Sequence, residues 1–261
     1  MTPPVKKEFP WWLLVLAVAG TYAFWRALTS DLHAQVLATL SKGIWITVLV
    51  TGVAFVSACV LGLGLALAGL SKVTLIRQAA RLYIEVMRGI PIIVLLLYVA
   101  FVGVPLLVAG WTALAGSLGL PGLTTRDVPF LWRAIAALTL AYSAFLAEVF
   151  RAGIMSVDAG QTEAAKALGL SAAQRFRLIV LPQAFRTVLP PLGNDFVAMV
   201  KDSSLVSVLG VTDVTQLGKV TAAGNFRYFE TYNMVALIYL TMTVILSLLL
   251  RRLEARLRRK G

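Results

Sequence analysis

The chain has almost none of the residues from which catalytic and metal centres are usually built. Cys59 is the only cysteine and His33 the only histidine among 261 residues. One cysteine forms no disulfide within a chain, and this pair excludes cysteine-rich metal sites and most Ser/His/Asp, Cys/His and HExxH schemes. A G-x-x-x-x-G-K-[ST] phosphate loop is also absent, because the run 62–64 (Gly-Leu-Gly) lacks the lysine. We therefore expect neither catalysis nor ATP hydrolysis from this chain alone.

Acidic residues are scarce as well: 12 Asp and Glu stand against 24 Lys and Arg, a net charge of +12. Apolar residues make up 59% of the chain and the mean hydropathy is +0.84. Soluble domains rarely exceed about half apolar residues, so the composition predicts an integral membrane protein. The basic residues lie in loops between apolar runs and not along one face, which argues against nucleic acid as a partner.

Long apolar runs are what the sequence has in abundance. A membrane-spanning helix needs roughly 20 apolar residues. The run 10–28 follows Lys6-Lys7 and could be a signal peptide. Its length, its tryptophans and the lack of a small-residue cleavage site before Asp31 favour a retained helix. The fold class predicted is an all-α, polytopic transmembrane bundle of six spans: 10–28, 44–70, 90–108, 131–150, 234–250 and, interrupted by Lys201-Asp202, about 188–209.

Basic residues predict the orientation of these spans. Six spans place both termini on one side of the membrane. Of the 24 Lys and Arg, 17 lie at the amino end, in 71–88, in 151–186 and in the tail from residue 251. Because Lys and Arg accumulate in cytoplasmic loops, both termini are predicted to be cytoplasmic.

Small residues repeat along the second predicted span. Ala58, Gly62 and Ala66 recur every four residues, with Gly64 and Ala68 beside them. This spacing allows two helix backbones to approach closely. It favours packing within one bundle over a pore lining.

A polar helix–turn–helix, residues 158–182 and here called the elbow, interrupts the apolar chain. The Ala-rich run 163–168 favours a helix, and Gly169 stands where a helix ends with positive φ. Ser171 with Gln174 forms the pattern of a capping box that begins a second helix. Pro182 opposes simple continuation of that helix.

Two roles remain open for the elbow on physical grounds. It could dock onto a cytoplasmic partner, or it could lie on the membrane surface as an amphipathic segment. After it, Pro190-Pro191 is expected to lead into the next span.

Several motifs resemble a known family. The elbow sequence DAGQTEAAKALGLSAAQRFRLIVLP resembles the EAA loop of ABC importer permeases. The runs 83–98 (YIEVMRGIPIIVLLLY), 147–154 (AEVFRAGI) and 189–211 (LPPLGNDFVAMVKDSSLVSVLGV) are similar to its polar amino-acid uptake branch. One departure is Asp202-Ser203-Ser204, where many relatives carry Asn or Asp followed by Thr-Ser.

The resemblance divides the chain into three parts. Residues 43–257 correspond to the permease domain, a type I importer core of five helices. Residues 1–42 are then an added cytoplasmic tail, an extra helix and an outer loop, and 258–261 form a basic tail.

The resemblance also implies partners. In that family the loop is a coupling helix that inserts in a groove of a separate cytoplasmic ATPase. The implied assembly in the cytoplasmic (inner) membrane has two ATPase subunits, a second permease chain, identical or homologous, and an extracytoplasmic solute-binding protein that delivers an amino acid. ATP and Mg would be bound by the ATPase and no cofactor by this chain, whose remaining contacts are with membrane lipid. The residues to which the resemblance assigns ATPase coupling are Glu163, Ala164, Ala165, Gly169, Leu181 and Pro182.

Charges inside spans indicate a candidate substrate path, because they are costly in a bilayer. Lys201 could meet a substrate carboxylate and a neighbouring acid its ammonium. Alternatively, Lys201 and Asp202 could pair with each other or with neighbouring helices. Glu148 could likewise form only a helix-end ion pair with Arg151. The candidates are Glu148, Asp195, Lys201, Asp202, Ser203 and Ser204, with Ser207 as a further hydroxyl.

The segment 212–232 is polar yet contains Phe226, Tyr228 and Phe229. On the predicted topology it faces outward, where it could contact a solute-binding protein or supply interfacial aromatic residues. Two rival functions differ in class. A gradient-driven transporter or channel predicts inverted repeats, of which the sequence shows none. A membrane-anchored scaffold would leave Lys201-Asp202 unexplained.

Overall fold

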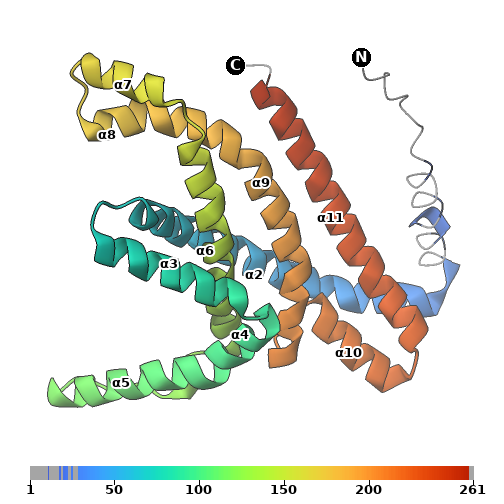
Figure 1. Cartoon of the computed structure of the whole chain (residues 1–261). Helices are drawn as coiled ribbons and strands as arrows, with labels where there is room; N and C mark the ends of the chain where they lie inside the picture. Colours follow the sequence, from blue (N-terminus) through green and yellow to red (C-terminus); the bar gives the residue numbers. More distant parts are fainter. Residues whose placement is uncertain (1–10, 12–17, 19, 23–24, 26–28, 259–261) are drawn as a thin grey trace.

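The computed structural model describes residues 11, 18, 20–22, 25 and 29–258, and all regular structure among them is helical (Figure 1). The expected span 10–28 lies largely outside the described residues. In chain order the helices are α2 (Asp31–Gly69), α3 (Thr74–Gly89), α4 (Ile92–Tyr98), the π-helix η1 (Val99–Gly103), α5 (Val104–Ser117), the 3₁₀ turn η2 (Thr125–Asp127), α6 (Phe130–Met155), α7 (Ala159–Ala167), α8 (Ala172–Arg175), the π-helix η3 (Phe176–Val180), α9 (Leu181–Asp202), the 3₁₀ helix η4 (Ser203–Leu209), α10 (Val214–Asn225) and α11 (Tyr228–Arg258).

Among the described residues, four helical segments are long and apolar enough to cross a membrane. They are α2, the continuous segment Ile92–Ser117, α6, and α11 as far as Arg256. Each overlaps one of the predicted spans, with bounds that differ by a few residues at 70 and at 90–91 and with longer helices elsewhere. The predicted span at 188–209 corresponds to the second half of α9 and to η4, and it is not among these four.

The segment expected as an outer loop before residue 43 is helical instead. α2 begins at Asp31 and runs unbroken into the membrane span. The run 31–42 contains neither Pro nor Gly, so nothing in it opposes a helix. Asp31, in the first turn, also has the charge that the positive end of the helix dipole favours.

The core is built where α2 packs along α6, the most extensive contact between two helices. Ala58, Gly62 and Ala66 are buried in this interface. A Cβ atom on Gly62 would lie 2.9 Å from the carbonyl oxygen of Ser143, so the close approach depends on glycine. The small residues of the second span therefore serve packing within the bundle, as predicted.

The prediction that Pro182 ends the second elbow helix is wrong. The amide of Leu181 donates to the carbonyl of Phe176, five residues earlier, and the chain continues through η3 into α9. A proline lacks the amide and crowds the carbonyl four residues before it. The wider π turn accommodates that crowding, so the helix continues. Pro190 and Pro191 likewise lie inside α9.

The helices place two different surfaces at opposite ends of the molecule (Figure 1). α7 and α8 project at the end where α11 finishes, whereas α10 and its connection to α11 lie at the other end. The elbow is thus the link between α6 and α9.

Candidate functional site

The first helix of the elbow presents most of its surface to the surroundings. α7 begins after Asp158, whose carboxylate accepts a hydrogen bond of 2.7 Å from the amide of Gly160. Ala165 is the buried residue of α7, while Glu163 and Ala164 are exposed. The predicted coupling residues on α7 therefore divide into one that holds the elbow together and two that are accessible to a partner.

The turn of the elbow has the geometry expected for Gly169. Its φ is +79°, a backbone conformation that a residue with a Cβ rarely adopts. The Gly169 amide donates to the Lys166 carbonyl at 3.0 Å, and the Leu170 amide to the Ala165 carbonyl at 3.1 Å. These two bonds form a Schellman motif, which closes α7.

The second helix of the elbow begins with the predicted capping box. The Gln174 amide donates to the Ser171 hydroxyl at 3.3 Å, and the Ser171 amide to the Gln174 side chain at 2.9 Å. Leu181 and Pro182 are exposed and stand where η3 passes into α9. They lie along the helix that leaves the elbow, not at its tip.

Leu168 is an elbow residue that the sequence analysis did not single out. Its side chain is 82% exposed, directly before the glycine of the turn. A single exposed apolar side chain is ordinary by itself, but its position at the turn of the projecting elbow makes Leu168 accessible to a partner. The sequence signal that could have identified Leu168 is an apolar residue directly before the glycine that ends a helix.

α9 brings two of the predicted path residues onto one face. Asp195 and Asp202 are seven residues apart, which is about two helical turns. The hydroxyl of Tyr142, on α6, donates to the Asp202 carboxylate at 2.7 Å, and the seven-residue spacing places Asp195 on the same side of α9. We call these two carboxylates the polar face of α9. Tyr142 was missed because a tyrosine in an apolar run also reads as a core residue.

Lys201 is exposed and forms no ion pair with Asp202 within the described part of the chain. The reason is geometric, since successive residues on a helix do not face each other. Of the serines, Ser203 is buried and its hydroxyl donates to the carbonyl of Val200 in the last turn of α9, while Ser204 is half-buried. Lys201 is therefore the path candidate that is available to a carboxylate.

The hydroxyl of Ser207 accepts a bond of 3.0 Å from the Lys219 ammonium. Lys219 belongs to α10, so this contact joins η4 to the helix at the end of the molecule away from the elbow (Figure 1). The sequence analysis did not foresee this partner.

Glu148 stands apart from the polar face. Its carboxylate lies 2.5 Å from the guanidinium of Arg151, three residues later on α6. Tyr142 lies six residues earlier, roughly 9 Å along the helix axis. The helix-end ion pair is thus the arrangement observed, and Glu148 does not join Asp195 and Asp202.

α10 is fastened at its first turn by Asp213. Its carboxylate accepts bonds from the Gln216 amide at 2.7 Å and from the Tyr239 hydroxyl at 3.0 Å. Burial raises the pKa of the Asp213 carboxyl, and these hydrogen bonds oppose the rise. Beyond the far end of α10, Phe226 and Phe229 are each 80% exposed. The aromatic residues of segment 212–232 are therefore accessible.

These features describe a membrane protein with a projecting helical elbow and a helix that runs from it to a polar face. Residues 58–259 match the family described as "Binding-protein-dependent transport system inner membrane component". The match covers more than half of the chain, so the chain belongs to this family.

Individual relatives of the chain are named as amino-acid permeases within this family. The chain is 38% identical over 81% of its length to the probable amino-acid permease protein YxeN of Bacillus subtilis, and covers 88% of that protein. It is 37% identical over 69% of its length to the glutamine transport system permease protein GlnP of Escherichia coli, covering 75% of it. A crystal structure of an amino acid ABC transporter with histidines has a TM-score of 0.69 and 35% identity, with 84% of this chain and 94% of that one covered.

The chain is accordingly a multi-pass permease subunit of the inner membrane, with the fold of a type I ABC importer. Permeases of this family are not themselves catalytic, and the ATPase is a separate subunit.

Proposed function

We propose that this permease carries polar amino acids inward, driven by an ATPase pair that binds the elbow. The observation that supports this most directly is continuity: α8, η3 and α9 follow without a break from Ala172 to Asp202. A displacement of the elbow would therefore turn or shift α9, and the polar face of α9 would move with it.

The polar groups suit a zwitterionic substrate. The ammonium of Lys201 would meet the substrate carboxylate, and Asp195 or Asp202 would meet the substrate ammonium. Charges inside a membrane are costly unless they are paired or serve a path. A second permease chain, identical or homologous, would supply the other half of the path.

The proposed orientation rests on the charge distribution, and the proposed partners rest on the family. The elbow and both termini would be cytoplasmic, because most Lys and Arg lie there. ATP and Mg would be bound by the ATPase. A solute-binding protein would dock at the opposite end, where Phe226, Tyr228 and Phe229 are exposed.

Replacing Gly169 tests the coupling. The assembled transporter, with its ATPase and binding protein, would be reconstituted in vesicles and assayed for both ATP hydrolysis and amino-acid uptake. A β-branched residue in the left-handed region costs about 1–2 kcal/mol, so Gly169→Val should distort the turn. We expect uptake to fall at least tenfold while the complex remains assembled.

Gly119→Val is the matched control, because Gly119 has a φ of +69° and equally open surroundings outside the elbow. It should leave uptake within about twofold of the unchanged protein. Normal uptake by Gly169→Val would contradict the coupling proposal. Uptake driven by an ion gradient without ATP would favour a secondary transporter instead.

A further inference from the structure

The last turns of α11 carry a group of exposed arginines. Arg251, Arg252 and Arg256 are all exposed, and none of them forms an ion pair with a residue that the structure describes. Glu254, which is half-buried, is the acidic residue among them. The surface formed by the three arginines, here called the arginine end of α11, therefore has a net positive charge and guanidinium groups available to an anion.

The depth of these arginines in a bilayer follows from the apolar stretch before them. Residues 233–250 contain no charged residue. Tyr232 is exposed, and tyrosine is enriched at membrane interfaces. It precedes Arg251 by 19 residues, which is about 28 Å along a helix axis. Because the hydrocarbon core is about 30 Å thick, Arg251 lies at one interface when Tyr232 lies at the other.

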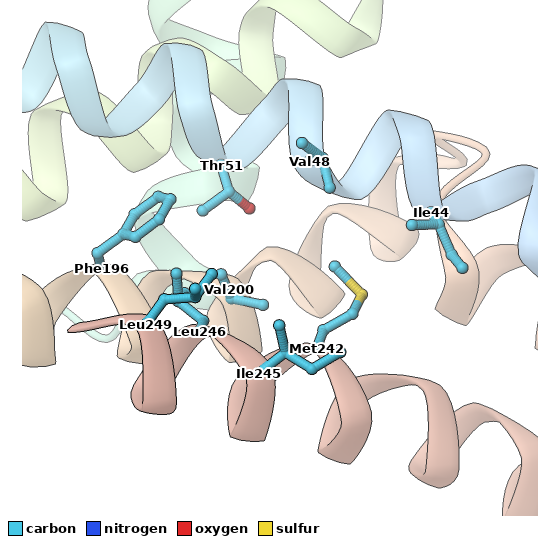
Figure 2. Close-up of a pocket in the computed structure, with 9 residues that line it drawn as sticks. All are labelled: Ile44, Val48, Thr51, Phe196, Val200, Met242, Ile245, Leu246 and Leu249. Atoms are coloured by element: carbon cyan, nitrogen blue, oxygen red, sulfur yellow. The ribbon is translucent and has the colours of Figure 1, made fainter. Parts of the chain in front are cut away.

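The half of α11 that precedes the arginines suits hydrocarbon. The hydroxyls of Thr241, Thr243 and Ser247 donate to carbonyls of α11 itself, so none of them needs water. The side chains that α11 turns towards α2 and α9 line an apolar groove between these three helices (Figure 2) and are Met242, Ile245, Leu246 and Leu249. The first groups of this part of α11 that require a polar environment are therefore the arginines.

All three arginines fall within the headgroup layer. A bilayer with its headgroups is about 40–45 Å thick, which leaves about 5–8 Å for the headgroups on each side. The span of α11 as far as Arg256 has 29 residues, about 44 Å of helix. Arg251 and Arg252 therefore lie in the first turn beyond the hydrocarbon, where lipid phosphates lie. The planar guanidinium group matches a phosphate with two parallel hydrogen bonds.

A fourth arginine lies towards the same end of the contact between α9 and α11. Leu250 packs against Gly193 of α9, because a Cβ atom added to that glycine would lie 3.1 Å from Leu250 side-chain carbons. Arg186 precedes Gly193 by seven residues, about two helical turns, so it lies on the same side of α9 and nearer the elbow. Arg186 is exposed and has no ion pair within the described part of the chain.

We propose that the arginine end of α11, together with Arg186, binds the headgroup phosphates of anionic phospholipids. Such lipids place negative charge and phosphate oxygens at the depth where these guanidinium groups lie. A bound headgroup would hold the end of α11 where Leu250 packs against α9.

Charge and depth distinguish this occupant from protein partners. A symmetric contact with a second copy of this chain would bring like arginines together, and like charges repel. The segment before residue 10 carries Lys6 and Lys7, so it is basic as well. The proposed contact with the ATPase is made by other helices, α7 and α8, which project from the molecule (Figure 1). A soluble ATPase lies outside the headgroup layer.

Photolabelling with two lipids would test the binding. The permease assembled with its ATPase would be placed in bilayers that contain either phosphatidylglycerol or neutral phosphatidylcholine, each with a diazirine next to the headgroup, and the adducts would be mapped by peptide mass spectrometry. We expect phosphatidylglycerol to label residues 249–256 at least threefold more than phosphatidylcholine. The excess should shrink in about 1 M salt, where charges are screened within about 3 Å. Equal labelling by the two lipids would overturn the proposal.

Two double variants show whether the arginines cause the excess. Arg251→Gln/Arg252→Gln should remove most of it. Arg126→Gln/Arg227→Gln removes the same number of charges from loops away from the elbow and should leave it unchanged. An excess that persists in the first variant, or falls equally in both, would contradict the proposed site.

A crosslinker among the arginines separates lipid from protein partners. Leu253 is 44% exposed and lies between them, so Leu253→p-benzoylphenylalanine places a photoreactive group there. We expect its adducts to be with phospholipid. Adducts mainly with the ATPase or with a second permease chain would overturn the proposal.

Thermal unfolding in detergent gives an independent readout. Added phosphatidylglycerol should raise the Tm of the unchanged protein and of Arg126→Gln/Arg227→Gln more than phosphatidylcholine does, since a ligand bound only to the folded state stabilises it. Arg251→Gln/Arg252→Gln should respond equally to the two lipids. A preference for phosphatidylglycerol that this variant retains would contradict the proposal. None of these outcomes depends on which substrate is transported.

Discussion

At the residue scale, Arg133 illustrates how this fold accommodates a charge within a membrane-spanning helix. It is buried near the start of α6, where its guanidinium donates to the carbonyls of Ala100 and Val128, both at 2.8 Å, and to that of Thr125. The Ala100 carbonyl needs this donor. The Val104 amide donates to Val99 instead, and the next residue along α5 is a proline without an amide.

We predict that Arg133→Met destabilises the protein. It would leave the Ala100 carbonyl without a donor, and each buried polar group left unsatisfied costs about 1–3 kcal/mol. The Tm in detergent should fall by several degrees. Arg126→Met, a change at an exposed arginine of the neighbouring loop, should shift it by less than one degree. Equal shifts for the two variants would show that the Arg133 contacts do not stabilise the fold.

At the scale of elements, the contact between α2 and α6 determines how closely the two helices approach. Ala58 and Ala66 allow contact through small side chains, and between them Gly62 allows contact through backbone alone. The helix that leaves the elbow is joined differently, through the π turn that accommodates Pro182. The α2–α6 contact is thus a close interface between two helices, whereas α8, η3 and α9 form one continuous helical segment.

Gly62→Val should separate α2 from α6. The added side chain would meet the Ser143 carbonyl, and overpacking of this kind costs about 1–3 kcal/mol. Gly64→Val is matched in residue type and helix but has nothing within 4 Å of its added Cβ. We expect Gly62→Val, and not Gly64→Val, to lower the Tm and the yield of folded protein. A similar loss for both would indicate helix propensity and not the interface.

At the scale of the whole molecule, the two ends carry surfaces of different kinds. The elbow end has Leu168 at its tip and the C-terminal end of α11 nearby, and the other end has α10 with Phe226 beyond it (Figure 1). The topology predicted from Lys and Arg assigns the first to the cytoplasm and the second to the outside.

Cysteine labelling would test that orientation. In a Cys59→Ala background, Leu168→Cys and Phe226→Cys place a thiol at two sites that are 82% and 80% exposed. A membrane-impermeant maleimide added to intact cells or spheroplasts should label Phe226→Cys, and Leu168→Cys only after the membrane is opened. The reverse pattern would contradict cytoplasmic placement of the elbow.

Turns, helix caps and helix-packing faces could be predicted from the sequence alone. The turn at Gly169 and the capping box of Ser171 with Gln174 depend on neighbouring residues, and the structure contains both. The small-residue spacing around Gly62 also predicted its interface, because helical periodicity is itself local. By contrast, Pro182 was predicted to end a helix because proline preferences are averages over contexts that lack a π turn.

The sequence by itself determined an all-α membrane protein with an elbow between two helices, because span length and helix capping depend on neighbouring residues, and its motifs resembled those of importer permeases. Tertiary structure alone decided which groups meet. It paired Tyr142 with Asp202, and Lys219 with Ser207. It also created the groove between α2, α9 and α11. These contacts join residues distant in the chain, and their geometry depends on how whole helices pack.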